Sequence, residues 1–383
     1  MKDIRVLVIG PRRGLIEVLR ERRIPFSIWQ QSPTFKVSPT ELSVVAPLFN
    51  SAGKIREQVR ISFPGQQFTH VIAGTESAVM PAAIARRQLG ARRASSSTSK
   101  LCRDKLLMKQ HLAEFGIPMT RFREDTQDLD PAKLFAEFGS PVVRKFRKSS
   151  GGRGLQLIRS PEEFVPAKQG VSILERFIDA PEASVESFIN GGRIQFANIT
   201  DYHIKGHTNF VPAVFEEALT KTLLELNERV ITALGITWGM THMEVYLTSK
   251  GPLFGEIAMR PPGGYIMNAI NQAWDFNPWE AFLAMELDEP FEFPRTPSAY
   301  AASEVLHPGV GRVVAVRGKS QVLDQQGIRE FRLKVKIGQQ LDARNTLGQD
   351  TGYVVHASAT HKERLALHNL IQATLQIELE SEV

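Results

Sequence analysis

Two short acidic strands around a turn constrain this chain more than any other stretch. Residues 241–246 carry Glu244 among apolar residues, and after a turn at residues 249–252 a second apolar segment carries Glu256. A hairpin that points both carboxylates to one face forms a pocket of hard oxygen ligands, which suits Mg²⁺ bridging nucleotide phosphates. Arg260 follows just before a Pro-Pro-Gly-Gly turn, where it could meet an anionic group held by that metal.

Solvated, outward-facing glutamates are the alternative reading of such a hairpin, because alternate residues of a half-buried strand face water. The neighbouring Met243, Val245, Phe254 and Ile257 are apolar. A carboxylate in such a setting needs a partner or a metal. The context therefore favours the metal site, while the pair of glutamates alone does not decide it.

Composition indicates a soluble protein of several domains. At 383 residues the chain is too long for one typical core and predicts two or three domains. Its hydrophobic content of 42% and charged content of 23% are ordinary. Arginine-rich stretches fit either nucleic acid or solvated helix faces, and the lack of interleaved aromatic residues argues against a nucleic-acid partner.

The cellular setting is expected to be the cytoplasm. Cys102 is the single cysteine, which excludes an intrachain disulfide and argues for a reducing compartment. No apolar run approaches the roughly 20 residues that span a membrane. The first residues run straight into a strand, which leaves no room for a signal peptide.

The N-terminal part predicts an open parallel α/β domain. Apolar strands are expected at residues 4–9, 26–29, 44–49 and 70–73, with an amphipathic segment after the first and an alanine-rich helix at residues 81–89. Such β-loop-α-β units build parallel sheets. The glycines after the first strand lack the G-x-G-x-x-G spacing, so no dinucleotide site is predicted there.

A glycine-rich hairpin follows a polar boundary at residues 94–100. A helix is expected over residues 101–115, and Lys105, which lies early in it, by itself reads as an exposed lysine. Lys145 ends the next strand, and the glycine-rich loop after it can fold over a polyphosphate. A merely flexible hairpin tip is the alternative. The loop is not a Walker motif, because G-x-x-x-x-G-K-[ST] is missing.

Further strands and helices complete the chain. The strand at residues 172–178 carries Glu175, which can read adenine edges and ribose hydroxyls or simply face outward. Segments 185–189 and 193–199 predict a hairpin across Asn-Gly-Gly. Helices are expected at residues 216–234, 268–286 and 361–375, and strands at 311–316, 331–337 and 352–356. The expected domains are residues 1–95, 96–190, 191–297 and 298–383.

Taken together, these features resemble the ATP-grasp superfamily, and within it the L-amino acid ligases and the biotin-carboxylase-like carboxylate–amine ligases. The most specific match is the ordered set at residues 234–237, 242–245 and 254–264, downstream of Lys105 and Lys145. The resemblance implies an N-terminal open parallel α/β domain, an ATP-grasp fold with antiparallel sheets, and a small C-terminal α+β cap. The fold class is therefore a multidomain α/β and α+β protein.

The resemblance also assigns roles to individual residues. It implies that ATP is bound by Lys105, Lys145, Ser149, Ser150, Gly151, Gly152, Gly154, Glu175, Phe177, Ile178 and Glu186. In this set the lysines contact phosphates, the serines and glycines form a mobile lid, and Glu186 is the acid on the ribose side. It implies Glu244 and Glu256 as metal ligands, Arg260 and Lys145 as catalytic residues, and a substrate site of His242, Arg260, Gly263 and Gly264.

One departure from the family pattern concerns the metal. Many ATP-grasp enzymes have asparagine two residues after the second glutamate, where this chain has Ala258. The number of Mg²⁺ ions therefore stays open, with Mn²⁺ as an alternative ion, since Mg²⁺ commonly keeps several waters as ligands.

The activity implied by the resemblance is an ATP-dependent ligation of a small carboxylic acid and an amine, with amino acids as the expected substrates. It would form a dipeptide-like amide through an acyl phosphate and release ADP and phosphate. The alternatives are a biotin-carboxylase-like enzyme that activates bicarbonate and an inactive nucleotide-binding protein. A homodimer is implied by the resemblance alone.

Overall fold

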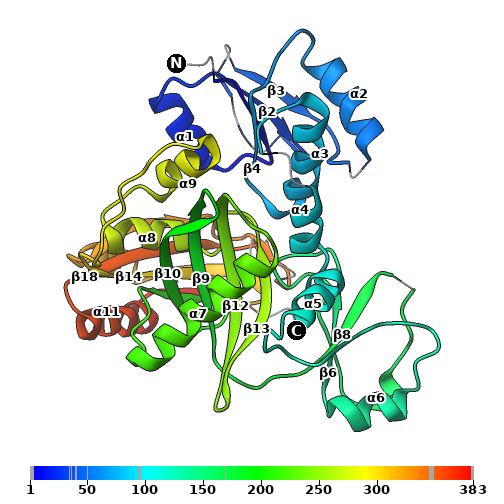
Figure 1. Ribbon diagram of the computed structural model, residues 1–383. Helices are drawn as coiled ribbons and strands as arrows, with labels where there is room; N and C mark the ends of the chain where they lie inside the picture. Colours follow the sequence, from blue (N-terminus) through cyan, green and yellow to red (C-terminus); the bar gives the residue numbers. More distant parts are fainter. Residues whose placement is uncertain are drawn as a thin grey trace.

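The computed structural model describes residues 4–33, 35, 37–38, 41–49, 51–93, 96–168, 170–344 and 349–380. The expected boundary at residue 95 lies at the edge of the undescribed residues 94 and 95. An N-terminal unit sits above a large central sheet, and a smaller unit carrying α6 projects to one side (Figure 1). Among the described residues, no helix is long and apolar enough to cross a membrane.

The N-terminal unit is a four-stranded parallel sheet. Its strand order is β3 (Leu42–Val45), β2 (Phe26–Gln30), β1 (Val6–Ile9) and β4 (His70–Ala73). Every residue of β1 and β4 is buried, as expected for parallel strands covered on both faces. The helices of this unit are α1 (Arg13–Glu21), α2 (Ala52–Ser62), α3 (Val79–Leu89) and the 3₁₀ turn η1 (Glu76–Ala78). The predicted open parallel α/β domain is confirmed.

Two helices replace the single one expected at residues 101–115. The chain forms α4 (Ser96–Arg103) and α5 (Lys105–Glu114). The break lies at Asp104, whose extended backbone and side chain cap the second helix by accepting from the Leu107 N–H. An N-terminal aspartate cap of this kind starts a new helix, so Lys105 becomes the first residue of α5.

The projecting unit is a four-stranded antiparallel sheet. Its order is β5 (Phe122–Glu124), β8 (Ser172–Arg176), β6 (Val142–Phe146) and β7 (Gln156–Ile158). It carries α6 (Pro131–Phe138) and the 3₁₀ turn η2 (Pro161–Glu163). Leu134, Phe138, Val142 and Leu174 form its small core. The glycine-rich loop joins β6 to β7 as predicted.

An eight-stranded antiparallel sheet forms the centre of the molecule. Its order is β13 (Gly251–Ala258), β12 (Gly239–Thr248), β9 (Glu182–Asn190), β10 (Arg193–Ile204), β11 (Thr208–Val211), β14 (Tyr300–Leu306), β18 (Gly352–Ser358) and β16 (Ile328–Leu333). The expected division at residue 190 falls inside the β9–β10 hairpin, and the division at residue 298 is crossed by β11–β14 pairing. Both are divisions of the sequence within one hydrogen-bonded sheet.

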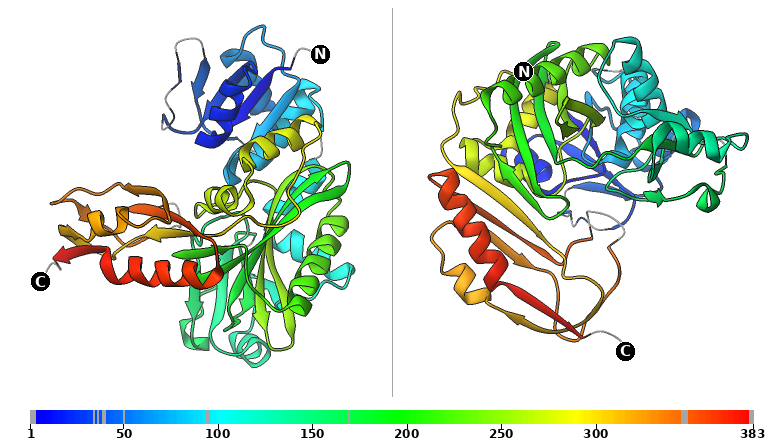
Figure 2. Two further views of the ribbon diagram at one scale, coloured as in Figure 1. Left: turned by 90° about the vertical axis from the view of Figure 1, so that its left-hand side faces the viewer. Right: turned by 90° about the horizontal axis from the view of Figure 1, so that it is seen from below.

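The remaining helices pack on this sheet. They are α7 (Glu217–Ala233), α8 (Ile266–Trp274), α9 (Pro278–Leu287), α10 (Lys319–Leu323) and α11 (His361–Thr374). The helix expected over residues 268–286 is two helices, because Asp275 is left-handed and Asn277 and Pro278 start α9. A three-stranded sheet of β17 (Gln340–Leu341), β15 (Gly311–Arg317) and β19 (Gln376–Glu380) completes the C-terminal part, which extends away from the N-terminal unit (Figure 2).

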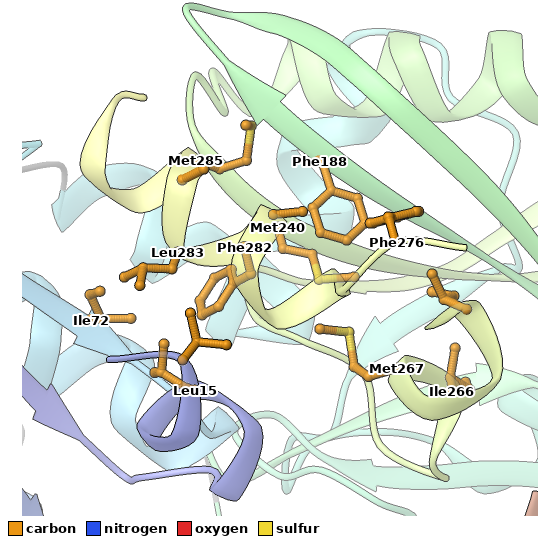
Figure 3. Close-up of a cluster of buried hydrophobic side chains, with 14 of the residues drawn as sticks. Leu15, Ile72, Phe188, Met240, Ile266, Met267, Phe276, Phe282, Leu283 and Met285 are labelled. Atoms are coloured by element: carbon orange, nitrogen blue, oxygen red, sulfur yellow. The ribbon is translucent and has the colours of Figure 1, made fainter. Parts of the chain in front are cut away.

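One apolar cluster joins the N-terminal unit to the central sheet. Leu15 of α1 and Ile72 of β4 meet Phe282 and Leu283 of α9, whose other side reaches Phe188 of β9 (Figure 3). All five side chains are at most 1% exposed, and burying such a side chain contributes about 1.5–3 kcal/mol. This cluster fixes the end of the N-terminal sheet against the sheet that carries the candidate site.

Candidate active site

The β12–β13 hairpin places the two predicted metal ligands directly opposite each other. Glu244 pairs with Glu256 in the strand register, and the register then shifts by one residue at a bulge before Val245. Gly255 allows this close approach, since a Cβ there would lie 3.0 Å from the Glu244 carbonyl oxygen. Both glutamates line the same two cavities, so the hairpin brings the predicted pair together on one face.

Each carboxylate has a cationic neighbour. Glu256 Oε2 lies 3.0 Å from Lys105 Nζ, which also donates to the Ser149 carbonyl at 2.9 Å. Glu244 Oε1 lies 3.4 Å from His242 Nε2. Burial alone would raise the pKa of Glu244, but the hydrogen bond and charge of His242 lower it to about 2. Ionised carboxylates are the form that binds a metal.

These two carboxylates fit a divalent ion that shares its ligands with phosphates. No group of three or more His, Cys, Asp or Glu side chains that could hold a metal is found among the described residues. Mg²⁺ is usually held by one or two carboxylates together with substrate phosphates and waters. The donor set of Glu244 and Glu256 therefore suits an ion that arrives with a nucleotide, rather than a site that the protein completes alone.

Lys145 belongs to a buried charge cluster beside the carboxylates. Its Nζ lies 2.8 Å from Glu175 Oε2, while Lys109 Nζ lies 3.2 Å from Glu175 Oε1. Burial would raise the pKa of Glu175, but the two lysines lower it to about 2. Lys109 also donates to Thr120 Oγ1 at 3.2 Å. Glu175 therefore positions Lys145, and its carboxylate is already occupied by two cations.

The first cavity, called here the nucleotide cavity, has a volume of about 390 Å³, within the range of small-molecule sites. It brings together most of the residues predicted to bind ATP. From that set it is lined by Lys105, Lys145, Ser149, Ser150, Gly151, Gly152, Glu175, Phe177 and Ile178. Gly154 is not among the lining residues. Its backbone φ is +72°, and a Cβ there would lie 2.2 Å from the Phe146 ring, so it shapes the loop instead.

The loop over this cavity is tied to the start of α5. Arg147 donates to both oxygens of Asp104, at 2.9 Å each, and to Glu124 Oε1 at 2.9 Å. The same Asp104 caps α5 and so sets the position of Lys105. One aspartate therefore fixes both the first phosphate-binding candidate and the root of the glycine-rich loop.

Glu186, expected on the ribose side of the nucleotide, is not among the residues that line the nucleotide cavity. Its side chain is fully buried and accepts from Ser184, Asn198, Thr200 and His242 at 2.6–2.9 Å. The acid of β9 that lines the cavity is Glu182, paired with Lys205. The two acids are four residues apart on one face of β9. The position of each along the strand therefore decides which one lines the cavity.

The second cavity, called here the substrate cavity, meets the first at the acidic hairpin. Its volume is about 520 Å³. The two cavities share Ser150, Gly151, Tyr202, Gly206, Glu244 and Glu256. The four residues predicted for the substrate, namely His242, Arg260, Gly263 and Gly264, all line it. A group transferred from one cavity to the other would therefore pass the two carboxylates.

His242 is the charged centre of the cavity wall. Its Nδ1 lies 2.9 Å from Glu186 Oε1, and its Nε2 lies 3.2 Å from the Tyr202 hydroxyl. Burial alone would lower the pKa of His242, but its contacts with Glu186 and Glu244 raise it to about 9. Glu186 therefore acts behind the site, where it orients the histidine.

Arg260 reaches the substrate cavity from the end of β13. Its Nε donates to Glu76 Oε2 at 2.7 Å and its NH1 to the Pro261 carbonyl at 2.8 Å. Glu76 comes from the N-terminal unit and also pairs with Arg103 at 2.6 Å. The predicted arginine is thus held by a residue about 180 positions earlier in the chain.

Sequence reasoning missed several residues of the site. Lys109 lies four residues after Lys105, one helical turn along α5, and that spacing was the available signal. Glu182, Tyr202 and Tyr246 line the nucleotide cavity, but an acid or a tyrosine on a strand carries no distinctive pattern. Glu76 could be found only from the packing of one unit on another.

Two family models match this chain. Residues 110–271 match the ATP-grasp domain, and residues 305–380 match the L-amino acid ligase C-terminal domain 2. The chain therefore contains an ATP-grasp domain, followed by an L-amino acid ligase C-terminal domain 2. It is homologous to the L-amino acid ligases.

Among curated relatives, an L-arginine-specific L-amino acid ligase of Bacillus subtilis is 27% identical over 235 residues, covering 56% of this chain and 57% of the relative. A formate-dependent phosphoribosylglycinamide formyltransferase of Ignicoccus hospitalis is 25% identical over 252 residues, covering 57% of this chain and 61% of the relative. The chain thus spans about 60% of the length of these relatives.

Solved structures share the fold over the whole chain. The L-amino acid ligase of Bacillus licheniformis has a TM-score of 0.82 at 18% identity and covers 100% of both chains. The N5-carboxyaminoimidazole ribonucleotide synthetase of Thermotoga maritima has a TM-score of 0.75 at 22% identity, covering 98% of this chain and 100% of its own. The predicted fold, including the ATP-grasp arrangement, is confirmed.

Proposed function

We propose that the protein is an ATP-dependent carboxylate–amine ligase that joins two small substrates, with amino acids as the expected class, into an amide and releases ADP and phosphate. The observation that carries this proposal is the meeting of two cavities at Glu244 and Glu256. One cavity has the lysines and glycine-rich loop of a nucleotide site, and the other contains Arg260. The homology to L-amino acid ligases supports the same reading.

The nucleotide is proposed to lie with its phosphates toward Lys105 and Lys145. Both ammonium groups reach the cavity that Ser150 and Gly151 cover, and charge-assisted contacts to phosphate are strong. The adenine end would lie near Phe177 and Ile178, where the chain leaves β8. The ribose hydroxyls are assigned to Glu182, since this acid lines the cavity and Glu186 does not.

Magnesium is the expected metal, with Glu244 and Glu256 as the protein's ligands. When bound, Mg²⁺ would neutralise phosphate charge and so favour phosphoryl transfer. The chain itself supplies further positive charge, because Lys105, the first residue of α5, lies 3.0 Å from Glu256.

The proposed reaction has two steps, a phosphoryl transfer to the carboxylate and an attack of the amine on the acyl phosphate. A substrate carboxylate oxygen attacks the γ-phosphorus of ATP, the bond to the β–γ bridging oxygen breaks, and ADP leaves. The neutral amine of the second substrate then attacks the acyl carbon, loses a proton and expels inorganic phosphate. Arg260 would stabilise the negative charge that builds on the acyl oxygen. Positioning and charge neutralisation provide the catalysis, so no protein nucleophile is needed.

A substrate panel tests this proposal. Purified protein with ATP and Mg²⁺ is given pairs of the twenty common amino acids, bicarbonate, and each compound alone, while ADP release and product masses are recorded. We expect ADP release with a pair that yields a dipeptide mass, and loss of both in Glu256→Gln. Bicarbonate-dependent ADP release without a dipeptide would instead support the carboxylase alternative. Nucleotide binding without ADP release in any mixture would support an inactive protein.

A further inference from the structure

Arg12, another arginine of the substrate cavity, donates hydrogen bonds to the turn that follows Arg260. The turn after β13 offers two successive carbonyls, and Arg260 NH1 donates to that of Pro261 at 2.8 Å. Arg12, at the start of α1 in the N-terminal unit, donates to that of Pro262 through NH1 and NH2 at 3.3 and 3.2 Å. Both side chains line the substrate cavity. A third arginine of the wall, Arg344, donates to the Gly206 carbonyl at 2.7 Å. Arg12 and Arg260 are thus the two arginines whose guanidinium groups bind successive peptides of this turn.

The two arginines differ in their charge compensation. Arg260 forms an ion pair with Glu76 at 2.7 Å, and Lys334, another cation of the wall, pairs with Asp350 at 2.7 Å. For Arg12, no ion pair with a carboxylate is found in the described part of the chain, and its acceptor is the neutral Pro262 carbonyl. Burial and the nearby Arg260 lower the pKa of Arg12 to about 10. A partly buried guanidinium without a counterion favours an anionic ligand.

The position of Arg12 depends on Gly74 and Gly14, where neighbouring atoms come too close to the backbone for any side chain to fit. A Cβ at Gly74 would lie 3.3 Å from Arg12 Cγ and 2.3 Å from the Gly10 carbonyl oxygen. A Cβ at Gly14 would lie 2.3 Å from the Trp279 ring, and the Arg12 guanidinium stands 5.1 Å from the centroid of that ring. This cation–π contact attracts the guanidinium to the ring without neutralising its charge. Arg12 is therefore preorganised toward the cavity.

We propose that Arg12 binds the free carboxylate of the amine substrate, so that the enzyme selects amines that also carry an acid group. This inference rests on the proposed function. Arg260 is assigned to the reacting acyl group, while Arg12, which binds the neighbouring peptide and has no carboxylate partner among the described residues, is assigned to an anion farther along the same substrates. The planar fork of arginine matches a carboxylate with two parallel hydrogen bonds. Arg12 would thus be the residue that distinguishes an amino acid from a simple amine at the amine position.

The test compares amino acids with their carboxamides, which keep the amine and lose the acid. One amino acid that supports ADP release serves as the fixed carboxylate substrate. Each of the twenty common L-amino acids and its carboxamide is then offered as the amine to the wild type, Arg12→Gln and Arg12→Lys. We expect kcat/KM of the wild type to favour acids over amides. Arg12→Gln should lower kcat/KM for the acids roughly 10- to 100-fold and leave the amides within about twofold, while Arg12→Lys should restore part of the loss.

Different results would contradict the role of Arg12 and the proposed ligase activity. Equal use of acids and amides by the wild type, or equal losses for both in Arg12→Gln, would overturn the role of Arg12 while the ligase proposal stands. Equal losses together with a lower melting temperature would mean that Arg12 only braces the turn. If no pair releases ADP, the ligase proposal fails. Calorimetric titration of the same acids and amides then still decides whether Arg12 binds a carboxylate.

A matched control is Arg56→Gln. Arg56 lies on α2 of the same unit, is exposed, and contacts Gln88 at 2.5–2.8 Å. It lines neither cavity, so this variant removes the same charge and should keep the wild-type preference for acids.

Discussion

Glu76 Oε2 accepts a hydrogen bond of 2.7 Å from Arg260 Nε, and this contact joins the N-terminal unit to the end of the acidic hairpin. The second oxygen of Glu76 is held by Arg103 at 2.6 Å. Glu76 thus forms ion pairs with both arginines. The orientation of Arg260 therefore depends on a residue outside the β12–β13 hairpin. The N-terminal unit therefore forms one wall of the candidate active site.

Arg260→Ala should reduce amide formation by roughly 10²–10³ while the KM for ATP stays nearly unchanged. The reason is that loss of one preorganised donor at a developing negative charge typically has this cost, whereas the lysines and the metal hold ATP. Steady-state kinetics and a melting curve on the same preparation check the prediction. A destabilised variant with normal turnover per folded molecule would assign Arg260 a structural role.

Glu76→Gln should lower kcat less than Arg260→Ala, and the two changes should not be additive. The amide keeps an acceptor oxygen but loses the charge that holds Arg260. Residues that act through one contact show coupling in double-mutant cycles. In the Arg260→Ala background, Glu76→Gln should therefore change kcat only slightly. Additive losses would mean that Glu76 acts on the substrate or on the fold by another route.

Lys145→Met should raise the KM for ATP by roughly 10- to 100-fold, because a hydrogen bond to a charged group contributes about 1.5–3 kcal/mol. Lys109 still pairs with Glu175 of β8, so the four-stranded sheet that carries Lys145 should remain folded. Lys133→Met is the matched control, since this lysine lies on α6 of the same unit and is 86% exposed. An unchanged KM for ATP in Lys145→Met would remove this lysine from the nucleotide site.

Glu304 supports a pH prediction away from the active site. Its Oε1 lies 3.2 Å from His356 Nε2 and 2.7 Å from His368 Nδ1. Burial would raise the pKa of Glu304, but these histidines lower it to about 2. Because folding lowers this pKa, the ionised carboxylate stabilises the fold above the unfolded value of about 4.3, and that stabilisation disappears as the pH falls toward 2.

Glu304→Gln should therefore lower the free energy of unfolding at pH 7 by about 2–3 kcal/mol, from a pKa shift of roughly two units. The difference from the wild type should shrink as the pH falls below about 4. Urea unfolding at pH 7, 5 and 3 measures it, with the exposed Glu292→Gln as control. A difference that stays constant with pH would show that the residue's charge is not what stabilises the fold.

Local patterns predicted much of this protein, and tertiary packing decided the rest. The acidic hairpin, the glycine-rich loop and the parallel N-terminal sheet follow from short-range alternation and turn residues. The helix breaks at Asp104 and Asp275 did not. An aspartate inside an apolar helical pattern does not reveal that it caps a new helix, as Asp104 does, or ends a helix in the left-handed conformation, as Asp275 does. Glu182 lines the nucleotide cavity and Glu186 lies behind it. Strand periodicity cannot give this difference, because it depends on how β9 crosses the sheet.

The expected divisions at residues 190 and 298 fall within one hydrogen-bonded sheet. The pairing of β11 with β14 joins strands on either side of residue 298, which local sequence patterns do not reveal. Lys109 and Glu76 also depend on long-range contacts, to Glu175 and to Arg260. Charged residues that pair across units look like ordinary surface residues in the sequence, so the network behind the site emerges only from the three-dimensional arrangement.

The most direct test of the central claim follows one oxygen atom. The protein is incubated with ATP, Mg²⁺, an amine and a carboxylate substrate labelled with ¹⁸O in both carboxyl oxygens, and the released phosphate is analysed by mass spectrometry. If an acyl phosphate forms at the junction of the two cavities, each phosphate carries a single ¹⁸O from the carboxylate. Unlabelled phosphate accompanying a normal yield of amide would contradict the account.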